Sequence, residues 1–180
     1  MEIVIRNSQR LIKIKHTKVK RILREALRYL KEKNRLDPLL VACYSSMELS
    51  VLFINDRKMR ELNLLYRGKD KTTDVLSFPQ QNRDALSVMR NELKENIFDT
   101  SPITHHGLLP LGDIVINLHQ TERQAKEYGI TFYQEVERLL IHGLLHLLGF
   151  DHETTEEDEK EMFDMQEEIL RKLIGDGLVP

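Results

Sequence analysis

Three histidines near the carboxyl end of the chain have a spacing that suits a metal ion. His142 and His146 are four residues apart in an apolar stretch, and His152 follows after Gly149. Side chains four residues apart on a helix share one face, with Cβ atoms about 5–6 Å apart, so both imidazoles can reach a Zn²⁺ at about 2.0–2.1 Å. Gly149 can adopt a left-handed conformation and end the helix, which lets His152 approach the same point. The sequence predicts one Zn²⁺ per chain, held by these three histidines.

Such a centre favours hydrolysis of an anionic substrate. Three protein ligands leave the fourth position of a tetrahedral zinc to water, as in catalytic sites. Zinc lowers the pKa of that water to roughly 7, and three neutral imidazoles leave the site with a net positive charge, which suits a phosphodiester. A lone His pair at this spacing is as often structural as metal-binding. The third His and the intervening Gly favour the metal, because unpaired imidazoles among leucines are costly to bury.

The same spacing occurs in the metzincin proteases, whose pattern is HExxHxxGxxH. The Glu that follows the first His is the general base of those enzymes. Here Gly143 occupies that position. The metal geometry is retained, but the mechanism of a peptidase is not.

Three segments together resemble a known family. Residues 142–152 match HGxLHLxGxDH, the signature of the YbeY family of bacterial single-strand-specific endoribonucleases. Two further family segments are matched by residues 62–79, which read LNLLYRGKDKTTDVLSFP, and by residues 111–117, which read LGDIVIN. The resemblance runs from about Glu48 to Leu173. The stretch from Gln80 to Pro110 is longer than is usual, which leaves the rim of the site and the substrate choice open.

The resemblance implies a zinc-dependent endoribonuclease that acts at the 3′ end of small-subunit rRNA and in ribosome quality control. It implies zinc ligands at His142, His146 and His152, and a functionally important arginine at Arg67. The implied partners are single-stranded RNA, the small ribosomal subunit and its assembly factors; DNA is not expected. Two alternatives stay open: a zinc hydrolase of another substrate, including a protease-like one, and a ribosome-assembly factor with a mainly structural zinc.

Arg67 also has a role that chemistry suggests. A guanidinium can bind phosphate oxygens through two bonds and stabilise charge that develops in the transition state. The alternative is a surface arginine stabilised at the end of a helix. Lys69 and Lys71 are either helpers or solvated loop charges, and Asp74 and Asp113 either orient ligand histidines or cap strands. The general base is not identified.

Hydrophobic periodicity and turn residues define the elements that must position these groups. Helices are expected near 17–32, 55–68, 121–129, 131–149 and 154–173, and strands at 2–5, 39–44, 48–54, 75–78 and 113–118. Leu65 in the second helix and Phe163 in the last are expected to face inward. The first helix has six apolar residues at helical spacing: Val19, Ile22, Leu23, Ala26, Leu27 and Leu30. Thr131 with Gln134, and Thr154 with Glu157, have the spacing of capping boxes at the starts of the last two helices. Helices and strands do not alternate regularly, so we expect a single α+β domain over residues 1–180. It should have a small mixed sheet of about four strands, several packed helices and a zincin-like metal helix.

Bulk charge does not identify a partner, but its distribution is uneven. The chain of 180 residues has 27 Lys and Arg against 29 Asp and Glu. Twelve of the bases lie between Arg6 and Arg35, and ten of the acids between Asp151 and Leu170. This predicts either a basic face for a ribosomal partner or two solvated helix faces of opposite sign. No signal-peptide pattern and no apolar run of about 20 residues are found, so a soluble cytoplasmic protein with a buried Cys43 thiol is expected.

Overall fold

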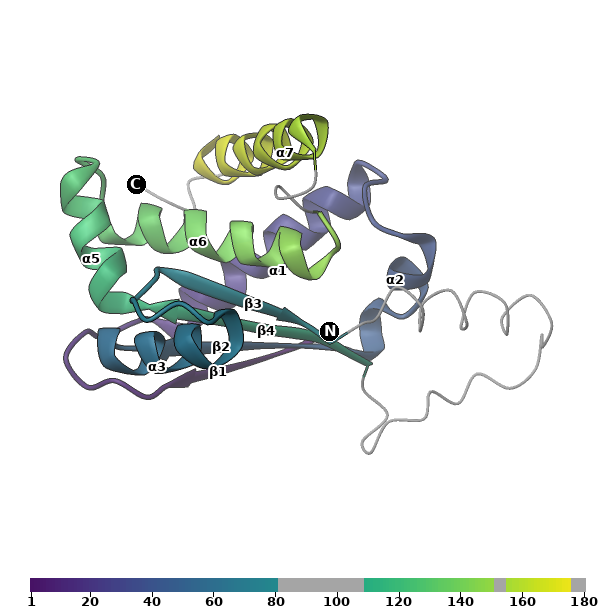
Figure 1. Ribbon diagram of the computed structural model, residues 1–180. Helices are drawn as coiled ribbons and strands as arrows, with labels where there is room; N and C mark the ends of the chain where they lie inside the picture. Colours follow the sequence, from purple (N-terminus) through teal and green to yellow (C-terminus); the bar gives the residue numbers. More distant parts are fainter. Residues whose placement is uncertain (81–108, 151–154, 176–180) are drawn as a thin grey trace.

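The computed structural model describes residues 1–80, 109–150 and 155–175 (Figure 1). The strands in this part of the chain are β1 Glu2–Asn7, β2 Met47–Ile54, β3 Val75–Pro79 and β4 Leu109–Asn117. The helices are α1 His16–Glu32, α2 Pro38–Ala42, α3 Asp56–Arg67, α5 Leu118–Glu127, α6 Phe132–Leu147 and α7 Glu156–Gly175. Most of the 80–110 segment lies outside the described residues.

The four strands form one mixed sheet in the order β1-β2-β4-β3. β1 and β4 both pair with β2 in parallel, with Ile3 opposite Leu49 and Val51 opposite Ile114. β3 runs antiparallel to β4, with Phe78 opposite Asp113, and lies at an edge of the sheet. The prediction of an α+β domain with a mixed sheet of about four strands is confirmed.

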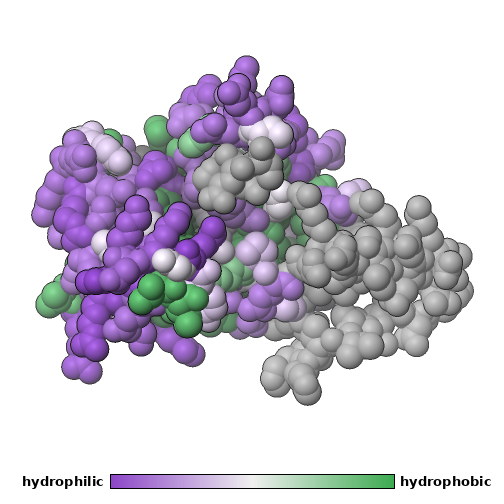
Figure 2. Space-filling view, in the orientation of Figure 1, coloured by the Kyte–Doolittle hydropathy of each residue, from purple (hydrophilic) through white to green (hydrophobic). Residues whose placement is uncertain are grey.

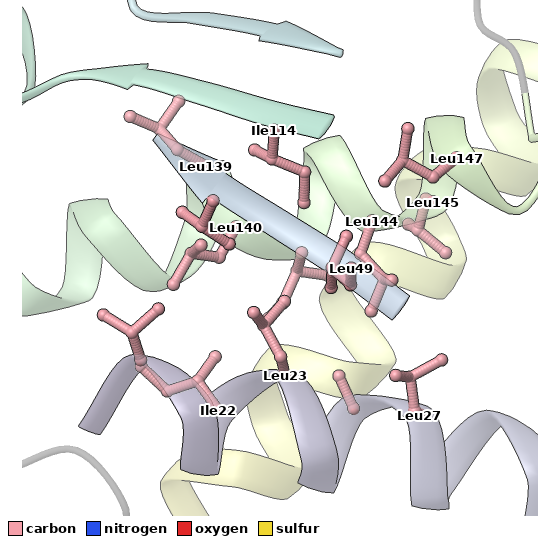
Figure 3. Packing of buried hydrophobic residues seen from close by; sticks show 14 of the residues in the cluster. Ile22, Leu23, Leu27, Leu49, Ile114, Leu139, Leu140, Leu144, Leu145 and Leu147 are labelled. Atoms are coloured by element: carbon pink, nitrogen blue, oxygen red, sulfur yellow. The ribbon is translucent and has the colours of Figure 1, made fainter. Parts of the chain in front are cut away.

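The larger core lies between one face of the sheet and helices α1 and α6. Leucines of α6 meet Ile114 of β4 and Leu49 of β2, while Ile22, Leu23 and Leu27 of α1 close the core from below (Figure 3). α7 packs against α1 and α6 on the side away from the sheet (Figure 1). All six predicted apolar positions of α1 are fully buried. Burial of each such side chain stabilises the fold by about 1.5–3 kcal/mol, so this core fixes the position of α6.

A smaller core forms on the opposite face of the sheet, under α3. Met59 of α3 packs against Leu76 and Val115, and Leu62 and Phe78 lie at the edge of this cluster. The predicted limits of the helix are confirmed, since Asn55 caps its start and Gly68, with φ 67°, ends it. The sheet therefore separates the helix that carries Arg67 from the helix that carries His142 and His146.

Several local predictions are wrong. Residues 39–44, predicted as a strand, belong instead to α2 and to a following 3₁₀ turn. Pro38 suits the first turn of a helix, and a short apolar run does not distinguish strand from helix. Leu65 and Phe163, predicted to face inward, are exposed. Cys43 is only half-buried.

The ends of several elements also differ from their prediction, by a few residues each. α5 begins at Leu118, before the predicted Thr121, because the Asn117 side chain accepts bonds from the amides of residues 119 and 120. β4 begins before the predicted residue 113. At α7 the capping hydroxyl is that of Thr155, which accepts from the Asp158 amide at 3.1 Å, where Thr154 was predicted.

The basic and acidic ends of the chain lie against each other. The Tyr29 hydroxyl of α1 donates to Glu168 of α7 at 3.3 Å, and Arg35 lies 3.5 Å from Glu161. One cation of the basic segment, Arg35 just after α1, is thus paired with an acid of α7, which agrees with two surfaces of opposite sign. Among the described helices, none has both the length and the hydrophobicity that a membrane span requires.

Glu137 of α6 is a buried carboxylate, and we predict that it makes folding pH-dependent. Burial raises the pKa of its carboxyl group from 4.5 to about 7, although the positive charge of Lys18 acts to lower it. The folded state therefore binds this proton more tightly than the unfolded state, so stability falls as pH rises from about 4.5 to 7. Glu137→Gln should raise stability by a few kcal/mol at pH 8 and change it little at pH 4.5. Thermal unfolding at both pH values tests this.

The exposed Glu167 of α7 provides the control. Glu167→Gln should not produce a pH-dependent gain in stability. An equal gain for Glu137→Gln at pH 4.5 and pH 8 would contradict the assigned burial cost.

Candidate metal centre

Both ends of α6 are fixed by local interactions that the sequence indicated. Thr131 and Gln134 form the predicted capping box at its start. At the other end Gly149 adopts a φ of 91°, and the Phe150 amide donates back to the carbonyl of Leu145 at 3.0 Å. The helix therefore ends within a turn of His146.

His142 and His146 lie side by side on a partly exposed face of this helix. Their Nε2 atoms are 3.2 Å apart, and their rings are nearly perpendicular, with centroids 4.7 Å apart. Two nitrogens that bind one tetrahedral Zn²⁺ are about 3.3–3.4 Å apart, given the usual bond length. Gly143, Leu144 and Leu145 between them are buried, so the helix directs only the two imidazoles toward the site.

A residue that the sequence analysis missed orients the first imidazole. Nδ1 of His142 donates to Oε1 of Gln166 at 3.0 Å, and Gln166 is almost fully buried in α7. This bond leaves the Nε2 of a neutral His142 with its lone pair directed at His146. Metal-binding histidines usually have such a partner on the other ring nitrogen. The geometry and the donor set of these residues therefore fit a zinc ion.

The remaining predicted site residues are less fully placed. His152 lies outside the described residues, so its position relative to His142 and His146 is not part of this geometry. Arg67 is the last residue of α3 and is exposed, on the side of the sheet opposite α6. The structure brings the first two histidines together and locates Arg67 at the end of a neighbouring layer.

Gly143 has a packing role that explains the missing glutamate. A Cβ at this position would lie 2.8 Å from Cγ2 of Ile114 and 3.1 Å from Oγ of Ser77. Position 143 therefore faces β3 and β4 where α6 lies close to the sheet. A larger side chain there would enter the interface between helix and sheet.

Other candidate residues have their own partners. Asp74 accepts from Gln124 at 3.1 Å, and Asp113 accepts from Gln80 at 2.7 Å. Asp74 also accepts from the Val75 amide at the start of β3, which agrees with the alternative in which it caps a strand, whereas Asp113 lies within β4 and holds Gln80 just after the end of β3. Lys69 and Lys71 are exposed in the loop after α3.

A second polar cluster, also missed in the sequence, joins the starts of α3 and α5. The Asp56 carboxylate accepts from Arg123 at 2.6 and 2.8 Å and from Asn117 at 2.8 Å. The bonds from Arg123 in particular lower the pKa of Asp56 to about 2. Asn117 is fully buried and also donates to Thr72 at 2.9 Å. The cluster therefore fixes the loop between α3 and β3, and with it the segment that follows Arg67.

Comparison with known proteins agrees with the motifs. Residues 4–174 match the family described as Endoribonuclease YbeY. A protein of that name from Thermodesulfovibrio yellowstonii is 37% identical over 93% of this chain and 94% of its own length. One from Clostridium botulinum (strain Loch Maree / Type A3) is 39% identical over 94% and 96%. The solution structure of TM1509 from Thermotoga maritima covers 97% of this chain and 90% of its own, with a TM-score of 0.55 and 27% identity.

Proposed function

The chain belongs to the YbeY family of endoribonucleases and is therefore a hydrolase of RNA, and we propose that it is a zinc-dependent nuclease for single-stranded RNA. The observation that carries the zinc proposal is the pair of Nε2 atoms 3.2 Å apart, with the opposite nitrogen of His142 bound to Gln166. His142, His146 and His152 would hold the ion.

The roles of the chain's own residues follow from this arrangement. A bound zinc would supply a Lewis acid and acidify a water molecule. His142 and His146 bind as neutral imidazoles, and Gln166 keeps the proton of His142 on Nδ1. The support for Arg67 is the family resemblance and not the arrangement of the two histidines; its guanidinium would bind a phosphate oxygen of the RNA and stabilise the charge that grows in the transition state.

A single comparison of substrates tests the proposal. Metal-loaded protein is incubated with labelled single-stranded RNA, double-stranded RNA and casein, each with and without a chelator. We expect chelator-sensitive cleavage of the single-stranded RNA alone. If the RNA stays intact and casein is cleaved, the proposal is refuted and the protein is a peptidase. If RNA is still cleaved after the chelator has removed the metal, the zinc is structural and not catalytic.

The packing of Gly143 predicts the result of restoring the protease glutamate. Gly143→Glu should lower stability by about 2 kcal/mol or more, because the side chain meets Ile114 and Ser77 and would bury a charge. It should not create peptidase activity. Thermal unfolding and a casein assay check both parts, and a stable, casein-cleaving variant would contradict the packing argument.

Gln166 should tune the affinity for zinc. Gln166→Leu removes the acceptor of His142 Nδ1 and should weaken zinc binding about 10–100-fold, the usual cost of losing such a partner. Gln166→Glu keeps an acceptor at this position and should retain most of the affinity. Competition with a fluorescent zinc chelator measures the zinc affinity of the wild type and of both variants. If Gln166→Leu binds zinc as tightly as the wild type, the hydrogen bond from His142 to Gln166 does not contribute to zinc binding.

We further propose that the substrate is ribosomal RNA, at the 3′ end of the small-subunit rRNA, with a role in ribosome quality control. The support is the family resemblance of the three motifs. The small ribosomal subunit and its assembly factors would be the partners, in the cytoplasm. Cleavage of a small-subunit rRNA precursor, with the new 3′ ends mapped, tests this step; cuts spread evenly along the precursor would contradict it.

A further inference from the structure

We propose that Tyr66 is a stacking platform for a base of the single-stranded RNA, next to a phosphate-binding strip formed by Arg67, Lys69 and Lys71. This inference rests on the proposed RNA substrate and adds a binding residue to it. Aromatic rings bind single strands without regard to sequence, because every base has a π-face.

The first observation is an exposed apolar surface at the end of α3. Leu64, Leu65 and Tyr66 are consecutive, with exposed fractions of 50%, 73% and 59%. Figure 2 shows an apolar patch in this region of the otherwise hydrophilic surface over α3. The periodicity of α3 predicted that Leu65 would be covered, and the structure leaves it open. Clustered exposed apolar side chains of this kind mark binding surfaces.

The second observation is that the Tyr66 ring is held in place while most of it stays exposed. Its centroid lies 4.9 Å from that of Phe78 in β3, with the two planes at 63°. An edge-to-face pair of this kind contributes about 0.5–1.5 kcal/mol beyond burial. Phe78 in turn packs at the edge of the small core under α3. The ring is thus supported from one side, as a stacking platform requires.

The third observation is the charge next to the ring. Residues 67–71 carry three cations and one acid, Asp70. Asp70 is bound by Arg60 through two bonds of 2.6 Å, so its charge is balanced within the fold. The Asn63 side chain donates to the Lys71 carbonyl at 2.7 Å and holds the loop. A polyanion therefore fits this surface better than an apolar protein segment, and charge complementarity selects RNA as the occupant.

Residues of β3 and β4 lie between this surface and the histidine helix. The Tyr66 ring packs against the Phe78 ring of β3, and Gly112 of β4 lies so close to the Phe78 carbonyl and to Leu147 that a Cβ there would be 2.8 Å from Cδ2 of Leu147. Leu147 directly follows His146 in α6. β3 is an edge strand, so an RNA whose base stacks on Tyr66 can cross this edge toward the histidines.

The test compares Tyr66→Leu, Tyr66→Phe and Tyr66→Trp with the wild type. Cleavage of single-stranded RNA by metal-loaded protein gives kcat and KM. Binding of a 2-aminopurine-labelled single strand, in EDTA to suppress cleavage, gives Kd and reports stacking through fluorescence. Tyr128→Leu alters a tyrosine of similar exposure at the end of α5 and is the matched control. Thermal unfolding of each variant separates binding from folding.

We expect Tyr66→Leu to raise Kd and KM about 5–100-fold, with a smaller change in kcat and a loss of the 2-aminopurine signal. Tyr66→Phe should bind within about twofold of the wild type and Tyr66→Trp at least as tightly, while Tyr128→Leu should have no effect. If a folded Tyr66→Leu binds RNA as tightly as the wild type, the inference is overturned, but the proposed function is not. The apolar patch would then be a surface for a protein partner. A loss in Tyr66→Phe as large as in Tyr66→Leu would also overturn it, since the hydroxyl would then be the contact. A wild-type protein that neither binds nor cleaves single-stranded RNA would overturn both.

Discussion

His146→Ala should lower the zinc content of the purified protein from about one ion per chain to nearly none and abolish RNA cleavage. The Nε2 of His146 lies 3.2 Å from that of His142, and an alanine side chain, which ends at Cβ, has no atom that can bind the ion. Loss of a catalytic metal removes several kcal/mol of transition-state stabilisation, so a fall of about 10³-fold or more in rate is expected. Elemental analysis and a single-turnover cleavage assay measure the two effects.

The fold should survive this change. His146 is only partly buried, and the apolar core residues of α6 are other side chains, mostly leucines, on its buried faces. His16→Ala, at the exposed start of α1, is the control and should retain zinc and activity. Since both imidazoles serve one ion, the double variant His142→Ala/His146→Ala should lose no more activity than either single variant. Equal zinc content in wild type and His146→Ala would remove this residue from the proposed ligand set.

The elements that sequence predicted well are those specified by local signals. The apolar positions of α1 recur at helical spacing and are all buried, and the Thr131–Gln134 capping box begins α6 as expected. The order of the strands was not predictable, because β2 pairs with β4 across more than 50 residues of chain. No local pattern specifies such a pairing.

In the candidate site, too, local spacing predicted some residues, while tertiary packing determines the position of others. The spacing of His142 and His146 predicted that they share a face, because four residues make about one helical turn. Gln166 belongs to a different helix, and its contact with His142 depends on how α7 packs on α6. One signal was present: Gln166 lies at the same helical face as Met162 and Ile169, where a polar residue needs a partner.

Periodicity also could not show which apolar residues remain exposed. It groups residues on one side of a helix but does not say how wide the buried part of that side is. Met59 of α3 reaches the small core, whereas Leu65, six residues further along and about 240° around the helix axis, is exposed. Arg67 lies at the same exposed end of α3.

Arg67→Ala should cleave RNA about 10²–10³-fold more slowly than the wild type while keeping its zinc and its fold. A preorganised charged donor that meets charge developing in the transition state typically has an effect of this size. Arg67 is exposed at the last turn of α3, and the small core under that helix is formed by other residues. Its loss should therefore change the rate and leave the thermal unfolding of the protein close to that of the wild type.

The proposed role also predicts which kinetic constant changes. Loss of a contact made mainly in the transition state lowers kcat, whereas loss of the base-stacking contact at Tyr66 raises KM. Arg67→Lys should recover only part of the rate, because an ammonium is a point charge and cannot bind two phosphate oxygens in a plane. Arg57→Ala, on the same helix and with 88% of its side chain exposed, is the matched control for loss of a surface arginine. If Arg67→Ala cleaves at the rate of Arg57→Ala, Arg67 is a surface residue without a catalytic role. If Arg67→Ala loses zinc or unfolds at a lower temperature, its role is structural, and another cation, with Lys69 and Lys71 as the nearest in sequence, must bind the phosphate.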